Sequence, residues 1–232
     1  MGKRGLVFRL KSTRNGGSIL KDKKVIVAGG CGLIGREIVR QFQELNANVK
    51  TLDLSPLADR RVDLIDGAYL SVVGLPDIFI NTVYPKRHEK HFRVFLESSE
   101  IIAERMAENN GGVIINIASI YGVIGGKPSM YEGTYVQHPP IGYSAAKGAI
   151  IAMTRALATK YGPYGVRVNC VSPGGVYDNQ DPVFVDRYCE RVPLGRMATP
   201  KDVANAVIFL ASDKANYITG VNLLIDGGIT AQ

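Results

Sequence analysis

Cysteine and histidine are scarce in this chain, and long apolar runs are missing. The three cysteines (Cys31, Cys170 and Cys189) are odd in number and form no C-x-x-C pair, which indicates neither a disulfide framework nor a zinc site. His88 and His91 stand three residues apart without an evident third ligand, so we expect a solvated loop there and no metal. Since no run has the length of a membrane span, we predict a soluble, cytoplasmic protein without membrane contact, in a reducing compartment.

Acidic residues are missing from the start of the chain, and this explains its net charge of +7. Residues 1–21 hold six basic residues and no acidic one, which leaves 22 basic against 21 acidic residues beyond them. We interpret residues 1–20 as a basic N-terminal extension, a solvated leader or a segment that mimics a transit peptide, and residues 21–232 as one domain. The domain is nearly neutral and nothing in it resembles an aromatic stacking platform, so nucleic-acid binding is not expected.

Glycines at regular spacing follow the first apolar run. Residues 25–28 are apolar and mostly β-branched, Gly29, Gly32 and Gly35 sit three apart, and helical apolar spacing starts at Leu33. Such a strand, tight turn and helix can bring backbone amides and the positive end of a helix dipole against a pyrophosphate. The pattern predicts a dinucleotide site, with a structural glycine turn as the alternative.

Strands alternate with helical patterns through the rest of the chain. A second strand ends at Asp53, 18 residues after Gly35, where an acid binds adenosine ribose hydroxyls and repels a 2′-phosphate. This favours NAD over NADP, although Arg36 and Arg60 could soften the preference. A third strand is expected to end at Asp63, and further strands at 76–81, 113–118, 166–171 and 221–225 alternate with helices at 92–108, 143–161 and about 200–210. The order predicts an α/β fold, a single-domain Rossmann-type doubly wound parallel sheet with helices on both faces.

A phenol and an ammonium group stand four residues apart in Tyr143-Ser-Ala-Ala-Lys147, on one face of the longest predicted helix. A positive charge near a phenol stabilises its phenolate, so Tyr143 could exchange a proton with an alcohol or a carbonyl. Ser119 follows an apolar strand and could hydrogen-bond the same substrate oxygen. A Tyr-x-x-x-Lys motif alone is weak evidence for a catalytic site, because both residues are common on helix surfaces. Its position after the glycine turn and the strand that ends at Ser119 makes a catalytic role the favoured interpretation.

At this point the chain resembles the short-chain dehydrogenase/reductase family from Lys21 onward. The matching segments are the three glycines, Asp53, Asp63, Asp77-Ile-Phe-Ile-Asn81, Asn116-Ile-Ala-Ser119, Tyr143-x-x-x-Lys147, residues 166–174 and residues 218–228. The resemblance implies a hydride transfer with NAD(P), in which Tyr143 is the acid/base, Lys147 lowers its pKa and Ser119 orients the substrate. It also implies a homotetramer or homodimer, with the helix after Tyr143 at one interface. The cofactor contacts that it implies are Gly29, Gly32, Leu33, Ile34, Gly35, Asp53, Asp63, Asn81, Tyr143, Lys147, Pro173, Gly174 and Val176.

Three features depart from the family pattern. The Gly32-Leu33 spacing resembles nucleotide-sugar epimerases, Asn81-Thr-Val-Tyr84 replaces the usual Asn-Asn-Ala-Gly, and no asparagine matches the one that anchors the family's proton relay. The rival hypotheses are therefore an epimerase or dehydratase that uses NAD transiently, and an NAD-binding protein without catalysis.

The interval from Ser119 to Tyr143 is 24 residues, about twice the family's usual length. The insertion resembles a subgroup associated with sialic-acid-like sugars and flagellin glycans, which implies a sugar-like substrate. Its aromatic and polar side chains suit a polyhydroxylated ligand, and we expect Tyr121, Tyr131, Tyr135 and His138 to contact it. The alternative is that these tyrosines only pack the loop down or cover an oligomer interface.

Overall fold

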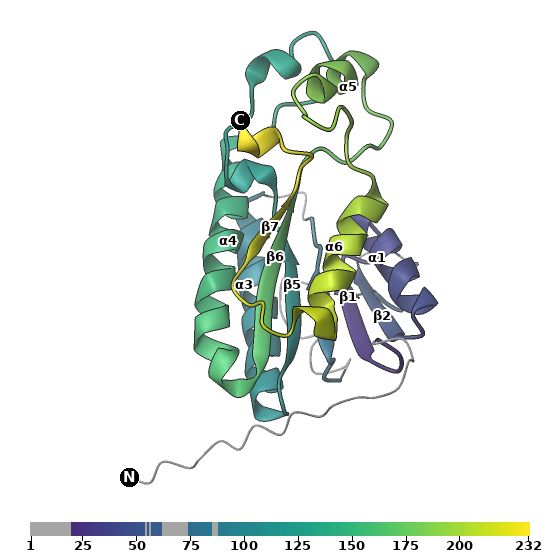
Figure 1. The fold of residues 1–232 in the computed structure, drawn as a ribbon, viewed down its shortest axis with the longest axis vertical. Coiled ribbons are helices and arrows are strands. Elements are labelled where there is room, and N and C mark those ends of the chain that lie inside the picture. Colours follow the sequence, from purple (N-terminus) through teal and green to yellow (C-terminus); the bar gives the residue numbers. More distant parts are fainter. Residues whose placement is uncertain (1–19, 54, 56, 62–73, 85–87) are drawn as a thin grey trace.

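A parallel sheet forms the centre of the computed structural model, which describes residues 20–232 apart from 54, 56, 62–73 and 85–87 (Figure 1). In the described residues seven strands lie in the order β3-β2-β1-β4-β5-β6-β7, and all neighbouring pairs are parallel. The strands are β1 (Lys24–Ala28), β2 (Asn48–Asp53), β3 (Arg60–Arg61), β4 (Ile78–Asn81), β5 (Gly112–Ile117), β6 (Val166–Pro173) and β7 (Asn222–Ile225). The predicted doubly wound α/β fold is confirmed.

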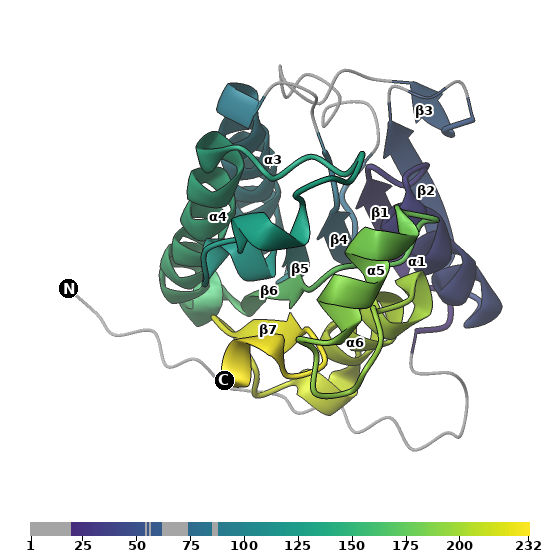
Figure 2. The same ribbon diagram turned by 90° about the horizontal axis from the view of Figure 1, so that it is seen from above.

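Helices cover both faces of this sheet (Figure 2). Helices α1 (Leu33–Glu44) and α6 (Pro200–Ala211) pack on one face, and α3 (His88–Glu108) and α4 (Ile141–Tyr161) pack on the other. Alternate residues of a strand pack into the two apolar cores on opposite faces of the sheet. Val25 and Val27 of β1 pack with α1 and α6, whereas Ile26 and Ala28 belong to the core on the other face. Burial on both sides explains why the central strands are almost continuously apolar.

A third, smaller apolar cluster lies beyond the carboxyl edge of the sheet. It joins the insertion, which contains the short 3-10 helices η1 (Ile120–Gly122) and η2 (Pro128–Met130), to helix α5 (Pro182–Cys189). Its buried members are Ile120, Met130, Tyr131, Phe184, Tyr188, Val192, Met197 and Ile229. Long loops within the insertion are thus held by a core of their own.

The helix boundaries follow from local signals in most places. Thr199 and Asp202 form a reciprocal capping box at the start of α6, and Asp181 caps α5 through the backbone N–H of Val183. The prediction of a loop around His88 and His91 is wrong, because α3 already begins at His88. The first turn of this helix includes residues with a high helix propensity. Strand β3 is present at residues 60–61, whereas Asp63 and the N-terminal segment 1–19 lie outside the described residues.

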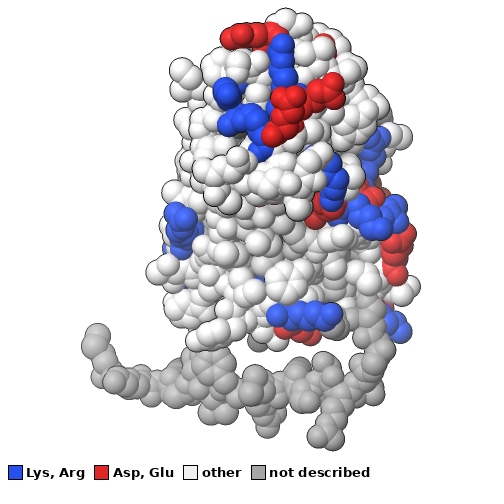
Figure 3. Space-filling view, turned by 45° about the horizontal axis from the view of Figure 1, so that its top comes forward, with Lys and Arg blue, Asp and Glu red and all other residues white. Residues whose placement is uncertain are grey.

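No helix in the described part of the chain is long and apolar enough to cross a membrane. On the face seen in Figure 3, basic and acidic side chains are interspersed and separated by wide uncharged areas. That face therefore carries no patch of a single charge among the described residues.

Candidate active site

The glycine turn between β1 and α1 is tightly constrained at two of its three predicted glycines. Gly29 has a φ of +79°, and a Cβ there would lie 2.7 Å from the carbonyl oxygen of Thr82. A Cβ on Gly35 would lie 2.2 Å from the carbonyl oxygen of Gly29, so the helix could not approach the turn. Gly32 is exposed and has space around it, and within the described part of the chain no side chain caps the helix that it begins. The first backbone N–H groups of α1 are thus left open to an anion.

Asp53 lies at the end of β2, beside this turn. Its carboxylate accepts the backbone N–H of Cys31 at 3.0 Å and that of Ser55 at 3.2 Å. Two donors fix the orientation of the carboxylate next to the glycine turn. The uncapped helix, the close glycines and this acid fit the adenosine and pyrophosphate portions of a dinucleotide.

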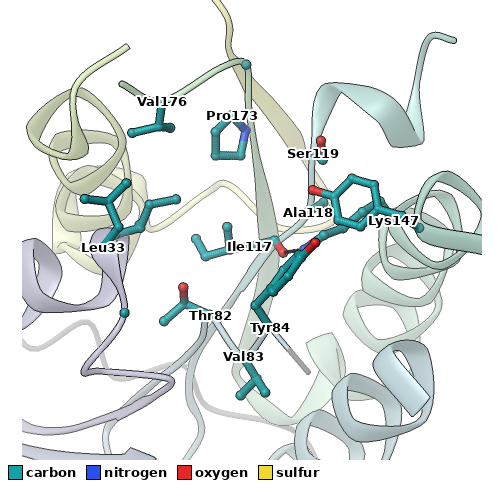
Figure 4. Close-up of a pocket in the computed structure, with 14 residues that line it drawn as sticks. Leu33, Thr82, Val83, Tyr84, Ile117, Ala118, Ser119, Lys147, Pro173 and Val176 are labelled. Carbon is teal, nitrogen blue, oxygen red and sulfur yellow. Dashed lines mark hydrogen bonds between the residues drawn. The ribbon is translucent and has the colours of Figure 1, made fainter. Parts of the chain in front are cut away.

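A first cavity of about 380 Å³ opens at the carboxyl edge of the sheet, beyond the turn (Figure 4). Leu33 and Val176 lie on one side of it, and Tyr84, Ser119 and Lys147 lie on the other. The lining residues are Gly32, Leu33, Ile34, Thr82, Val83, Tyr84, Ile117, Ala118, Ser119, Tyr143, Lys147, Pro173, Gly174 and Val176. Most of the expected cofactor contacts therefore meet in one place.

Asn81 does not line this cavity, although a cofactor contact was expected there. It is fully buried at the end of β4 and donates from Nδ2 to the Ser98 hydroxyl at 2.7 Å. The Asn81 side chain points toward α3, away from the cavity. The next three residues, 82–84, line the cavity instead.

Ser119, Tyr143 and Lys147 converge from two elements. Ser119 follows β5 and accepts the backbone N–H of Tyr121 at 3.2 Å, and its hydroxyl also hydrogen-bonds Tyr143. Lys147 is only 4% exposed; its Nζ donates to the Ile117 carbonyl at 2.8 Å and lies 5.7 Å from the centre of the Tyr143 ring. One helix face thus carries both the phenol and the amine, as the spacing predicts.

The pKa values in this cluster differ from the expected pattern. Burial raises the pKa of Tyr143 to about 12, and the hydrogen bond from Ser119 only partly opposes this effect. Burial also lowers the pKa of Lys147 to about 7, because no acidic partner among the described residues offsets its desolvation. The net result is a raised pKa of Tyr143 in this structure, so the lowered pKa implied by the family resemblance is not seen. The physical reason is that burial disfavours the charged form of each group, the phenolate of Tyr143 and the ammonium of Lys147.

A second cavity of about 330 Å³ adjoins the first. Tyr84, Ser119, Tyr143 and Gly174 line both, so they form the wall shared by the two cavities. The other lining residues are Ile120, Tyr121, Tyr131, Val136, Gln137, His138, Pro139, Pro140, Gly175, Gln180, Phe184, Tyr188 and Met197. Aromatic rings are the most frequent side chains, Gln137 and Gln180 add amides, and none of these described lining residues is Asp, Glu, Lys or Arg.

The insertion contributes Tyr121, Tyr131 and His138 to this cavity, and their contact with a substrate stays a prediction. The hydroxyl groups of Tyr121 and Tyr131 hydrogen-bond each other, and the rings of Tyr131 and His138 meet edge to face at 4.9 Å. Tyr135 points away: it is 70% exposed, and its hydroxyl donates to the Asn179 carbonyl at 3.3 Å. Its contact serves the packing of the loop, which is the alternative given for these tyrosines.

Helix α5 closes the other side and was not expected at the site. Phe184 and Tyr188 are one helical turn apart and both face the cavity, a spacing that the sequence displays without indicating where the helix lies. Arg187 fastens α5 to the insertion by donating to the Ser129 carbonyl at 3.2 Å and the Glu132 carbonyl at 2.6 Å.

Known proteins resemble both the sequence and this architecture. Residues 92–230 match the family described as enoyl-(acyl carrier protein) reductase. The chain is 31% identical to the 3-oxoacyl-[acyl-carrier-protein] reductase FabG of Chlamydia muridarum, over 91% of this chain and 99% of that protein. It is 34% identical to the L-rhamnose 1-dehydrogenase (NAD(P)(+)) of Azotobacter vinelandii, over 68% of this chain and 59% of that enzyme.

A solved structure agrees with these relatives. The short chain dehydrogenase of Leptospira borgpetersenii with bound NAD+ superimposes with a TM-score of 0.80 at 34% identity, over 91% of this chain and 94% of that one. The chain belongs to the short-chain dehydrogenase/reductase family. It is an NAD(P)-dependent oxidoreductase.

Proposed function

We propose that the protein transfers a hydride between NAD and a hydroxyl or ketone of a sugar-like substrate, with Tyr143 as the acid/base. The observation that carries this proposal is the wall shared by the two cavities, where Ser119 and Tyr143 border both. A substrate oxygen in the second cavity would meet both hydroxyl groups. When bound, the nicotinamide supplies or accepts the hydride.

Tyr143 moves the proton in this scheme. With a pKa of about 12 it keeps its proton at neutral pH and can donate it to a carbonyl oxygen as an alcohol forms. Ser119 holds the same oxygen. In the reverse direction Tyr143 takes the alcohol proton, and the Lys147 ammonium stabilises the phenolate that drives this step.

Asp53 supports NAD rather than NADP. Its carboxylate is fixed beside the glycine turn by two backbone N–H groups, so it cannot easily move away from a 2′-phosphate. Repulsion between like charges in a partly buried site costs on the order of 1–4 kcal/mol.

A sugar-like substrate fits the second cavity because apolar sugar faces stack on aromatic rings and sugar hydroxyls bind amides such as Gln137 and Gln180. The rhamnose dehydrogenase supports this class, whereas FabG supports a 3-oxoacyl group as the alternative. The sialic-acid-like subgroup would add a carboxylate, for which the described lining residues offer neither Lys nor Arg.

The decisive experiment incubates the protein with neutral sugars, acidic sugars, nucleotide-activated sugars and a 3-oxoacyl thioester, each with NAD and with NADP. Net formation or consumption of NADH with a sugar supports the proposal. Conversion of a sugar without net NADH would identify the transient use of NAD by an epimerase or dehydratase. Cofactor binding without any turnover would support the non-catalytic alternative.

We also propose that two copies of the chain associate through α4. Ala145, Ala152 and Ala156 are exposed on α4, and Ala149 between them is half-buried, so packing on their own sheet does not explain these small residues. We propose that this face packs against a second copy in a dimer or tetramer. The described cysteines are free, in agreement with the cytoplasmic location that we also propose.

A further inference from the structure

The turn after β6 borders both cavities. Gly174 lines both of them, and Gly175 lines the second. The Gly174 N–H donates to the Ile225 carbonyl at 3.0 Å, and the Gly175 carbonyl accepts the Ala198 N–H at 2.9 Å. The Gly175 N–H donates to the hydroxyl oxygen of Tyr188 at 2.5 Å. Among these bonds, the last is the one made by a side chain.

Tyr188 is held firmly under this turn. It is 2% exposed, and its ring packs on Phe184 with centroids 5.9 Å apart. Phe184 packs in turn on Tyr131 at 5.1 Å. A row of rings therefore connects the insertion with the turn.

The fit between Tyr188 and the two glycines leaves no free space. A Cβ on Gly174 would lie 2.7 Å from the Tyr188 hydroxyl oxygen, and a Cβ on Gly175 would lie 2.9 Å from its Cζ atom. The position of the hydroxyl thus determines how close the turn comes to α5.

We propose that Tyr188 is a positioning residue for the cofactor, which sets the Gly174–Gly175 turn against the nicotinamide end of the first cavity. It touches no part of the first cavity itself, since it lines only the second. Its effect reaches the cofactor through the backbone of Gly174 and Gly175. This role is independent of the proposed acid/base and of the substrate class.

The test replaces Tyr188 with phenylalanine in the full chain and measures NADH binding by fluorescence titration without substrate. Loss of the acceptor leaves the Gly175 N–H unpaired, and we expect NADH binding to weaken about tenfold, the equivalent of roughly one hydrogen bond. The matched control is Tyr161→Phe, a tyrosine that is 5% exposed at the end of α4 and distant from the turn. It should leave NADH binding unchanged even where it lowers the melting temperature as much.

A second measurement separates positioning from general loss of stability. Gly174→Ala is introduced into the wild type and into Tyr188→Phe, and the four NADH dissociation constants form a double-mutant cycle. Removing the hydroxyl creates room for the new Cβ, so the alanine should cost several-fold less in the Tyr188→Phe background. Equal costs in both backgrounds, or unchanged NADH binding in Tyr188→Phe, would overturn the proposal. Equal weakening by Tyr161→Phe would overturn it as well.

Discussion

Replacing Lys147 with methionine should make the protein more stable at neutral pH while it removes turnover. Methionine fills a similar volume and needs no solvation in the buried position, which is only 4% exposed. The lysine, by contrast, loses its hydration on folding and gains the hydrogen bond to the Ile117 carbonyl and contacts with the ring faces of Phe95 and Tyr143. This one variant would then show that the lysine lowers the stability of the fold and that its proposed role in catalysis is a separate property.

The sign and size of the effect follow from the pKa of Lys147. In the unfolded chain the amine has its ordinary pKa of 10.5, and in the folded chain burial lowers the pKa to about 7. Between these values the unfolded state holds more protons, so this group makes the free energy of unfolding rise with pH. The burial penalty at pH 7 is on the order of 4 kcal/mol, and it disappears as the pH approaches 10.5. The lost hydrogen bond to Ile117 costs about 1 kcal/mol at every pH.

Urea unfolding of wild type and Lys147→Met should therefore give a difference that changes with pH. We expect the variant to be more stable by about 2–3 kcal/mol at pH 7, and slightly less stable near pH 10. Lys160→Met serves as control, because Lys160 lies on the same helix but is 59% exposed and pairs with Glu100. A variant that is less stable than wild type at pH 7, or a stability difference that does not vary with pH, would refute the reasoning.

Four further predictions concern the site. Tyr143→Phe should lower turnover by about 10²–10⁴-fold with little change in NADH affinity, because only the proton-transfer group is lost; near-native turnover would contradict the assignment. Asp53→Ala should bring the affinities for NADPH and NADH closer together, as binding titrations would show, and an unchanged ratio would mean that Asp53 does not face the ribose. Tyr131→Ala and His138→Ala, made one at a time, should reduce kcat/KM for the sugar without weakening NADH binding; unaltered kinetics with a lower melting temperature would assign them to packing alone. For alcohol oxidation by the wild type, the rate should rise with pH below the Tyr143 pKa of about 12, because the phenolate fraction rises, provided that proton abstraction limits the rate.

The sheet and the cofactor end of the site could be predicted from the sequence because they depend on local patterns. Apolar runs and the glycine spacing specify β1, the turn and α1, and the steric limits at Gly29 and Gly35 explain why those positions are glycine. Tyr143 and Lys147 meet because helical spacing alone places them on one face. Ser119 could be predicted from its place at the carboxyl end of an apolar strand, where open α/β sheets bind their ligands.

The substrate end was less predictable because it depends on contacts between segments far apart in the sequence. Phe184 and Tyr188 enter the site only because α5 packs on the insertion, and the exposed position of Tyr135 depends on the same packing. The pKa values could not be predicted either. The charge of Lys147 suggests an effect on Tyr143 from spacing alone, but burial, a property of the fold, decides the pKa of both groups.

The third apolar cluster has a consequence for how such a protein changes over generations. Its buried residues are separate from those of the two cores that bind helices to the sheet. Substitutions among Tyr131, Phe184 and Met197 can therefore alter the shape of the second cavity while the cores that fold the chain keep their packing. A lineage could exchange one substrate for another through this cluster and retain the same cofactor and the same Tyr143.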